Sequence, residues 1–121
     1  MTRAKQDGRI FVPYRRIAYV DWSMVAAFGR VDELARRLPT DGDIEAARRL
    51  LADRLAAKSY QAGTDRLALF GPVLFTTALT LAACDVAPGR DHAVLVWARR
   101  ELVSSVVHGV EEKKGATLGE G

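Results

Sequence analysis

The sequence has few of the residues that build covalent or metal-based frameworks. Cys84 is its one cysteine, and His92 and His108 are its two histidines. An intrachain disulfide is therefore excluded, and so is a zinc site of the Cys/His type. A single domain of 121 residues buries roughly 65% of its unfolded surface, which is enough for a core without such supports.

The sequence also lacks the motifs that mark common enzyme sites. It has no G-x-G-x-x-G fingerprint and no P-loop, and Ser104 and Ser105 lie outside any G-x-S-x-G setting. His108, Glu111 and Glu112 have the spacing of metal ligands on a helix, but this partial set is more typical of a solvated helix end. We therefore expect a non-catalytic protein with no cofactor and no bound metal.

Other scarce residues bear on origin and compartment. Asparagine is absent, isoleucine is rare and arginine outnumbers lysine, a bias that indicates a GC-rich bacterial genome. Residues 1–20 contain no long apolar run after their basic residues, so they do not have the form of a secretory signal. Together with the single cysteine, this predicts a cytoplasmic protein.

The longest uncharged run covers residues 67–84, and its 18 residues would span about 27 Å as a helix. This length approaches the thickness of a bilayer, so a single membrane span is one interpretation. Gly71-Pro72, three threonines and the lack of a one-sided excess of basic residues favour a buried core helix instead. "LAAC" at 81–84 matches a lipobox but lies far from the N-terminus, and we interpret Cys84 as a buried, inert thiol.

Apolar side chains recur at three- and four-residue steps, which predicts four helices. These cover about residues 22–38, 43–60, 65–85 and 91–113. Residues 13–20 stay open between a helix that starts at Pro13 and extended chain, because the segment is rich in aromatic and β-branched residues. In the third helix, Gly71-Pro72 requires either a kink or a late start at Pro72. The predicted fold is an all-α, four-helix-bundle-like domain with the apolar third helix at its centre.

Charge divides the chain unevenly. Residues 1–20 carry five basic side chains and one acidic, a net of +4, whereas the other residues carry 13 basic and 14 acidic, a net of −1. We therefore predict a basic N-terminal arm at 1–12, a helical domain at 13–114 and a flexible tail at 115–121.

The basic arm is the surface that we expect to meet a partner. Its candidate partner-binding residues are three arginines and two aromatic anchors: Arg9, Phe11, Tyr14, Arg15 and Arg16. These predict a small interaction or assembly protein, with a homo-oligomer favoured because so apolar a helix needs much cover. The alternative is a nucleic-acid-binding accessory or regulatory protein that uses the same arm, and a second alternative is a single-span membrane protein through 67–84.

A helix-turn-helix formed by the first two helices is less favoured. The turn between them is acidic, and Asp43 and Glu45 stand at the start of the second helix. DNA phosphates would repel carboxylates at the position where a recognition helix approaches the duplex.

Overall fold

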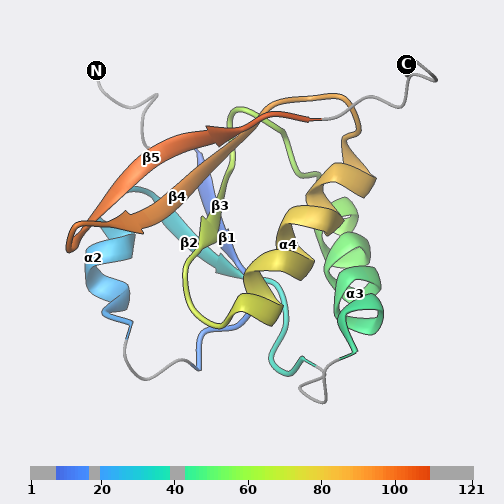
Figure 1. Cartoon of the computed structure of the whole chain (residues 1–121), viewed down its shortest axis with the longest axis horizontal. Coiled ribbons are helices and arrows are strands. Elements are labelled where there is room, and N and C mark those ends of the chain that lie inside the picture. Colours follow the sequence, from blue (N-terminus) through green and yellow to red (C-terminus); the bar gives the residue numbers. More distant parts are fainter. Residues whose placement is uncertain (1–7, 17–19, 39–42, 110–121) are drawn as a thin grey trace, which may run out of the picture.

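The computed structural model describes residues 8–16, 20–38 and 43–109. They form an α/β fold with one five-stranded mixed sheet and three helices (Figure 1). The elements in chain order are β1 Arg9–Val12, α2 Trp22–Ala26, β2 Arg30–Glu33, α3 Ile44–Ala57, β3 Arg66–Leu69, α4 Val73–Val86, β4 His92–Ala98 and β5 Glu101–Val107.

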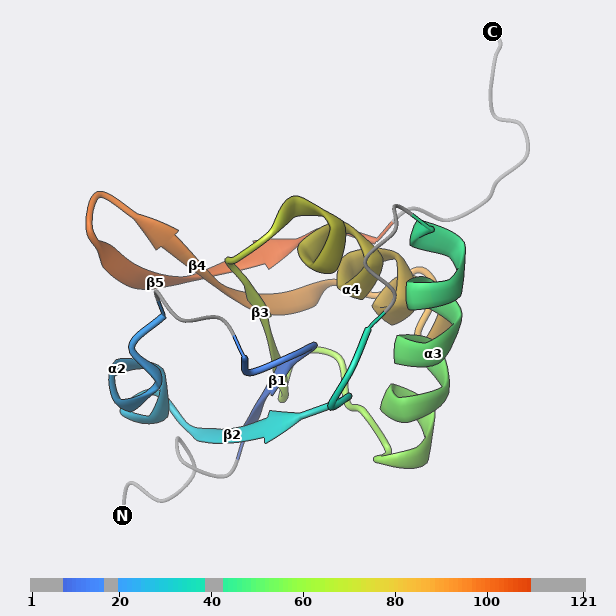
Figure 2. The ribbon, with the colours of Figure 1, turned by 90° about the horizontal axis from the view of Figure 1, so that it is seen from below.

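The sheet has the strand order β2-β1-β3-β4-β5, in which the first four strands are parallel and β5 is antiparallel to β4. Helices α3 and α4 pack on one face of the sheet, and α2 lies on the other side (Figures 1 and 2). Phe11, Leu67 and Val94 point into the core beneath α3 and α4. Their strand neighbours Ile10 and Leu95 point the opposite way, into a smaller core beneath α2.

The prediction of an all-α, four-helix bundle is therefore wrong. The fourth predicted helix, about 91–113, is the β4–β5 hairpin over its described part. Its apolar residues satisfy a helical stripe, but they are also rich in valine, which favours strands. Arg99 and Arg100 form the two-residue turn between Ala98 and Glu101, and neither a glycine nor a proline marks this turn.

The first predicted helix is also largely wrong. Asp21 is the N-cap as expected, and its side chain accepts a hydrogen bond from the Ser23 backbone N–H, but α2 ends at Ala26. Residues 30–33 form the edge strand β2 instead. The described part of the predicted arm contains β1, an interior strand that pairs with β2 on one side and with β3 on the other.

The second predicted helix is confirmed as α3. The side chain of Asp43 accepts a hydrogen bond from the Ala46 backbone N–H at 3.1 Å, as an N-cap does. After the helix, the backbone of Ser59 has a left-handed conformation, with φ of 55°.

The uncharged run 67–84 is divided between β3 and α4. Gly71 has φ of 110°, which favours glycine, and Pro72 is the N-cap of α4, so the late start is confirmed and a kinked helix is wrong. Within the described ranges, no helix is both long and apolar enough to cross a membrane. Cys84 lies half-buried on α4, where burial raises the pKa of its thiol above the usual value.

Candidate binding cleft

A cleft of about 460 Å³ lies at the carboxyl ends of β3 and β4. One wall comes from the start of α2, the floor from the end of β3, and the other wall from the β4–β5 hairpin. Its lining residues are Val20, Asp21, Val25, Leu69, Phe70, Gly71, Val96, Trp97 and Leu102. The carboxyl ends of the parallel strands are where open α/β sheets bind ligands, and the volume falls in the range of small-molecule or side-chain sites.

Trp97 is the most exposed large side chain of the cleft. It is 52% exposed, although it stands next in sequence to the half-buried Val96 and opposite the buried Leu102. Side chains alternate between the two faces along β4, so Trp97 lies on the same face as Leu95. Helix α2 covers Leu95 on this face but leaves Trp97 exposed. An indole left in water at the mouth of an apolar cleft is a contact surface that the fold itself does not use.

Asp21 is the one titratable residue among those that line the cleft. Its carboxylate accepts hydrogen bonds from the Ser23 hydroxyl at 2.6 Å and from the Ser23 backbone N–H at 3.1 Å. These bonds hold the pKa of Asp21 below its usual value, so the carboxylate is ionised near neutral pH. Since this group caps α2 and has no base or nucleophile beside it in the lining, the cleft is equipped for binding.

The tip of the β4–β5 hairpin adds positive charge beside the cleft. Arg99 and Arg100 have φ of 49° and 67°, a left-handed conformation in which non-glycine residues are uncommon. Both arginines are exposed. The turn therefore presents two adjacent guanidinium groups within three residues of Trp97.

A chain of aromatic contacts links the cleft to Arg15. Phe70 lines the cleft and lies 6.1 Å from the Trp22 ring, between centroids. The guanidinium of Arg15 lies 5.5 Å from the Trp22 centroid, and the Trp22 indole N–H donates to the Arg15 carbonyl at 2.9 Å. The Arg15 backbone N–H in turn donates to a Glu33 carboxylate oxygen at 2.9 Å. Arg15 is thus fixed at the same edge of the sheet as the cleft.

The structure separates the five predicted partner-binding residues. Arg15 and Arg16 are exposed, and Tyr14 is half-buried with its ring 5.6 Å from that of Phe75. Phe11 is fully buried in the core, so its ring is not available as an anchor for a partner. Arg9 lies at the opposite end of β1, where it forms an ion pair within the protein.

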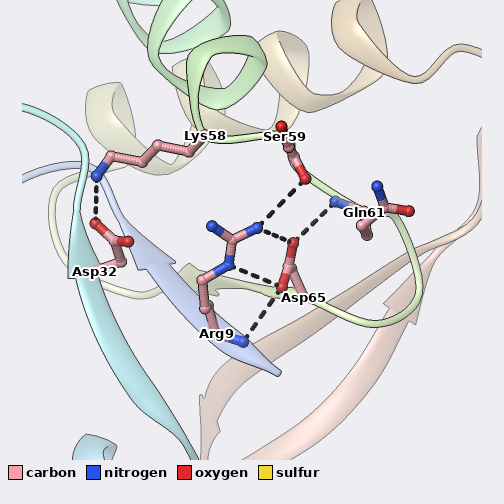
Figure 3. Close-up of polar contacts among 6 residues, drawn as sticks. All are labelled: Arg9, Asp32, Lys58, Ser59, Gln61 and Asp65. Carbon is pink, nitrogen blue, oxygen red and sulfur yellow. Dashed lines mark hydrogen bonds and ion pairs between the residues drawn. The ribbon is translucent and has the colours of Figure 1, made fainter. Parts of the chain in front are cut away.

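Arg9 belongs to a polar cluster at the amino ends of the strands (Figure 3). Its guanidinium donates to both Asp65 carboxylate oxygens, at 3.3 and 2.9 Å, and to the Ser59 carbonyl at 3.3 Å. The Asp65 side chain, 4% exposed, also accepts from the backbone N–H groups of Arg9 and Gln61. Each carboxylate oxygen of Asp65 thus accepts two hydrogen bonds within the protein. The cluster joins β1 to the loop before β3.

Beside this cluster, Lys58 and Asp32 form an ion pair at 2.8 Å (Figure 3). This bond joins the end of α3 to strand β2. The two ion pairs together hold the loop after α3 against the sheet.

His92 is a second internal polar group. It is 1% exposed, its Nδ1 atom lies 2.6 Å from the Tyr60 hydroxyl, and the two rings are stacked. The Nε2 atom has no hydrogen-bond partner among the residues that the structure describes. Burial lowers the pKa of the imidazole, which therefore stays neutral.

Of the three residues with metal-ligand spacing, only His108 lies within the described ranges. The ring of His108 lies 3.2 Å from the Asp91 carboxylate, and Glu111 and Glu112 fall outside the described residues. No group of three or more metal-ligating side chains occurs in the part of the chain that is described.

Comparison with family models, with curated proteins and with solved structures found no match. The functional assignment is consequently argued from geometry and chemistry. Sequence reasoning missed Trp97 and the arginine turn, because the segment was interpreted as a helix. The sequence signal that could have revealed them is the pair of adjacent arginines between two valine-rich runs.

Proposed function

We propose that this protein is a non-catalytic interaction module, whose cleft between α2 and the β4–β5 hairpin receives an aromatic or apolar side chain of a partner protein. The observation that carries the proposal is the exposed Trp97 at the mouth of an apolar cleft. Protein interfaces place aromatic residues at their centre, where a fully desolvated ring contributes most of the binding free energy.

The charges around the cleft favour an acidic segment. Four exposed arginines, Arg15, Arg16, Arg99 and Arg100, lie at this edge of the sheet, against the exposed carboxylates of Asp21 and Glu101. The four arginines exceed the two carboxylates, so this edge of the sheet carries a net positive charge of +2, although Asp21 remains ionised. A partner with carboxylates next to its apolar anchor would meet these arginines without burying a charge, which raises the association rate and the specificity.

Single-stranded nucleic acid is the second candidate partner. Trp97 and the adjacent Arg99-Arg100 pair combine a stacking surface with phosphate-binding cations, as proteins that bind single strands do. Asp21 argues against it, because a nucleic acid lying along the cleft carries a phosphate at every nucleotide, and some of these phosphates would lie near this carboxylate. A peptide can place its apolar side chain in the cleft and its carboxylates beside the arginines instead.

A nuclear magnetic resonance titration of the uniformly ¹⁵N-labelled chain separates the two candidates. The probes are a capped peptide with one phenylalanine between aspartates, and a short oligo-deoxythymidine. W97A is the test variant, and M24A is the matched control, since Met24 is 40% exposed on α2 but does not line the cleft. We expect the peptide to shift the Trp97 indole signal and W97A to weaken binding at least tenfold, or ~1.4 kcal/mol. M24A should bind like the wild type.

Three outcomes decide between the partners. Peptide binding that W97A does not affect, or shifts confined to α3, would overturn the cleft as the site. Binding of the oligonucleotide alone, lost in W97A and weakened by added salt, would overturn the protein partner in favour of nucleic acid. Absence of binding by either probe at millimolar concentration would overturn both assignments of the cleft.

A further inference from the structure

Strand β5 is an unprotected edge of the sheet. It stands last in the strand order, and its sequence ELVSSVV has one charged residue, Glu101, at the start and no proline. The other edge strand, β2, has the sequence RVDE, in which three of four residues are charged. Charges and prolines are the usual means of protecting an edge from pairing with another chain, and β5 has almost none.

The hairpin turn determines which backbone groups of β5 are free. In a two-residue turn, the residue that follows it, here Glu101, directs its N–H to the carbonyl of its opposite, Ala98. Antiparallel pairing then alternates, so Val103 and Ser105 also direct their N–H and C=O groups to β4. The N–H and C=O groups of Leu102, Ser104 and Val106 therefore point outward, and no other described strand lies on that side.

We propose that β5 pairs antiparallel with β5 of a second copy of this chain, around a twofold axis at Ser104. If the twofold axis is perpendicular to the sheet, each pair of facing residues has its two side chains on the same face of the extended sheet. Pairing Ser104 with Ser104 satisfies this requirement. It also places Leu102 opposite Val106 of the other copy, so that all three residues with outward-pointing backbone groups form hydrogen bonds. This inference depends on the edge of the sheet, and Leu102 is the one residue of the cleft lining that takes part in it.

The side chains of β5 suit this register. Leu102 opposite Val106 makes an apolar pair on each side of the axis, and Val106 is 50% exposed in the single chain. Ser104 is exposed and small, so two copies of it fit at the axis. Within β5 no like charges face one another, which removes the usual penalty of self-pairing.

The charges at the two ends of the hairpin are also complementary in this register. Arg100 lies opposite His108 of the second copy, and the side chain of His108 contacts the Asp91 carboxylate, which is 64% exposed. Arg100 of one copy would therefore stand at the level of Asp91, an exposed carboxylate, of the second copy. A partner of other sequence would lack this match, and for this reason we commit to self-association.

Light scattering coupled to size-exclusion chromatography measures the mass of the particle in solution. The pairing is tested by substitutions that place a charge at the twofold axis. In S104K the two lysines would face one another across the axis, and in S104E the two carboxylates would. S105K is the matched control, because Ser105 is equally exposed but faces Val103 of the second copy in place of itself. We expect wild type and S105K to be dimers, S104K and S104E to be monomers, and an equimolar mixture of S104K with S104E to regain the dimer mass.

The remaining outcomes contradict the proposal. A wild type that stays monomeric at about 100 µM, well above a micromolar dissociation constant, overturns it. A dimer that persists in S104K assigns self-association to another surface. Loss of the dimer in S105K as well, or no recovery in the mixture, excludes the Ser104 axis. Circular dichroism spectra of each variant exclude unfolding as the cause.

Discussion

The ion pair between Arg9 and Asp65 gives the sharpest test of the fold. The sequence predicts Arg9 as an exposed cation of the arm, whereas the structure pairs it with the buried Asp65. D65A removes the acceptor of four hydrogen bonds: three from Arg9 and one from the Gln61 backbone N–H. It leaves a guanidinium whose side chain is only 20% exposed, with the Ser59 carbonyl as its remaining acceptor.

Breaking one half of a buried ion pair costs about 3–5 kcal/mol. We expect the lower end for D65A, about 3 kcal/mol, since Arg9 is not fully buried. A domain of ordinary stability has about 5–15 kcal/mol in total, so the variant should unfold about 10 °C below the wild type. Urea denaturation followed by far-ultraviolet circular dichroism measures the difference in the free energy of unfolding.

A double-mutant cycle distinguishes a true pair from a general loss of packing. R9M and D65L each leave one buried charge without its partner, whereas R9M/D65L replaces both by apolar groups of similar size. The double variant should lie within about 2 kcal/mol of the wild type, and the coupling energy should exceed about 2 kcal/mol. A loss below 1 kcal/mol in D65A, or a coupling energy near zero, would refute the reasoning that Asp65 is a buried partner of Arg9.

Two further predictions concern the buried histidine and the arginine turn. Because burial lowers the pKa of His92 in the folded chain, its contribution to stability is complete above about pH 6.5 and falls with pH below that value, by at most ~1.4 kcal/mol per pH unit. Denaturation at several pH values should show that the free energy of unfolding falls below about pH 6.5 in the wild type and in the control H108Q, and that this fall is absent in H92L. The same pH dependence in H92L would contradict the attribution to His92. R99N/R100G supplies the Asn-Gly pair that this turn favours, and should raise the free energy of unfolding by about 1 kcal/mol while weakening binding of the acidic peptide; a lower melting temperature in calorimetry would contradict the left-handed turn.

Helix starts that depend on neighbouring residues could be predicted from the sequence. The N-caps Asp21 and Asp43 and the start of α4 after Gly71-Pro72 follow from side-chain chemistry within a few residues. Helix α3 could be predicted in full, because one face is apolar and the other charged, and only a helix has that period.

The strands could not be identified in the same way. Strands β3 and β4 are largely buried, so their side chains are apolar on both faces and show no alternation of apolar and polar residues. Such a run fits a buried helix as well as a strand. The predicted arm shows the same ambiguity, since the charge of Arg9 is evident in sequence, but its partner Asp65 lies 56 positions further along the chain.

What the sequence by itself determined is the N-caps of α2 and α3, the absence of an intrachain disulfide, and the amphipathic helix α3. Only the tertiary structure decided that the remaining apolar segments pair into a sheet, that Phe11 is buried and Arg9 is paired internally, and that Trp97 stands at the mouth of a cleft. The physical reason is range: caps and turns depend on bonds between near neighbours, whereas strand pairing, burial and the cleft bring together segments that are far apart in the chain.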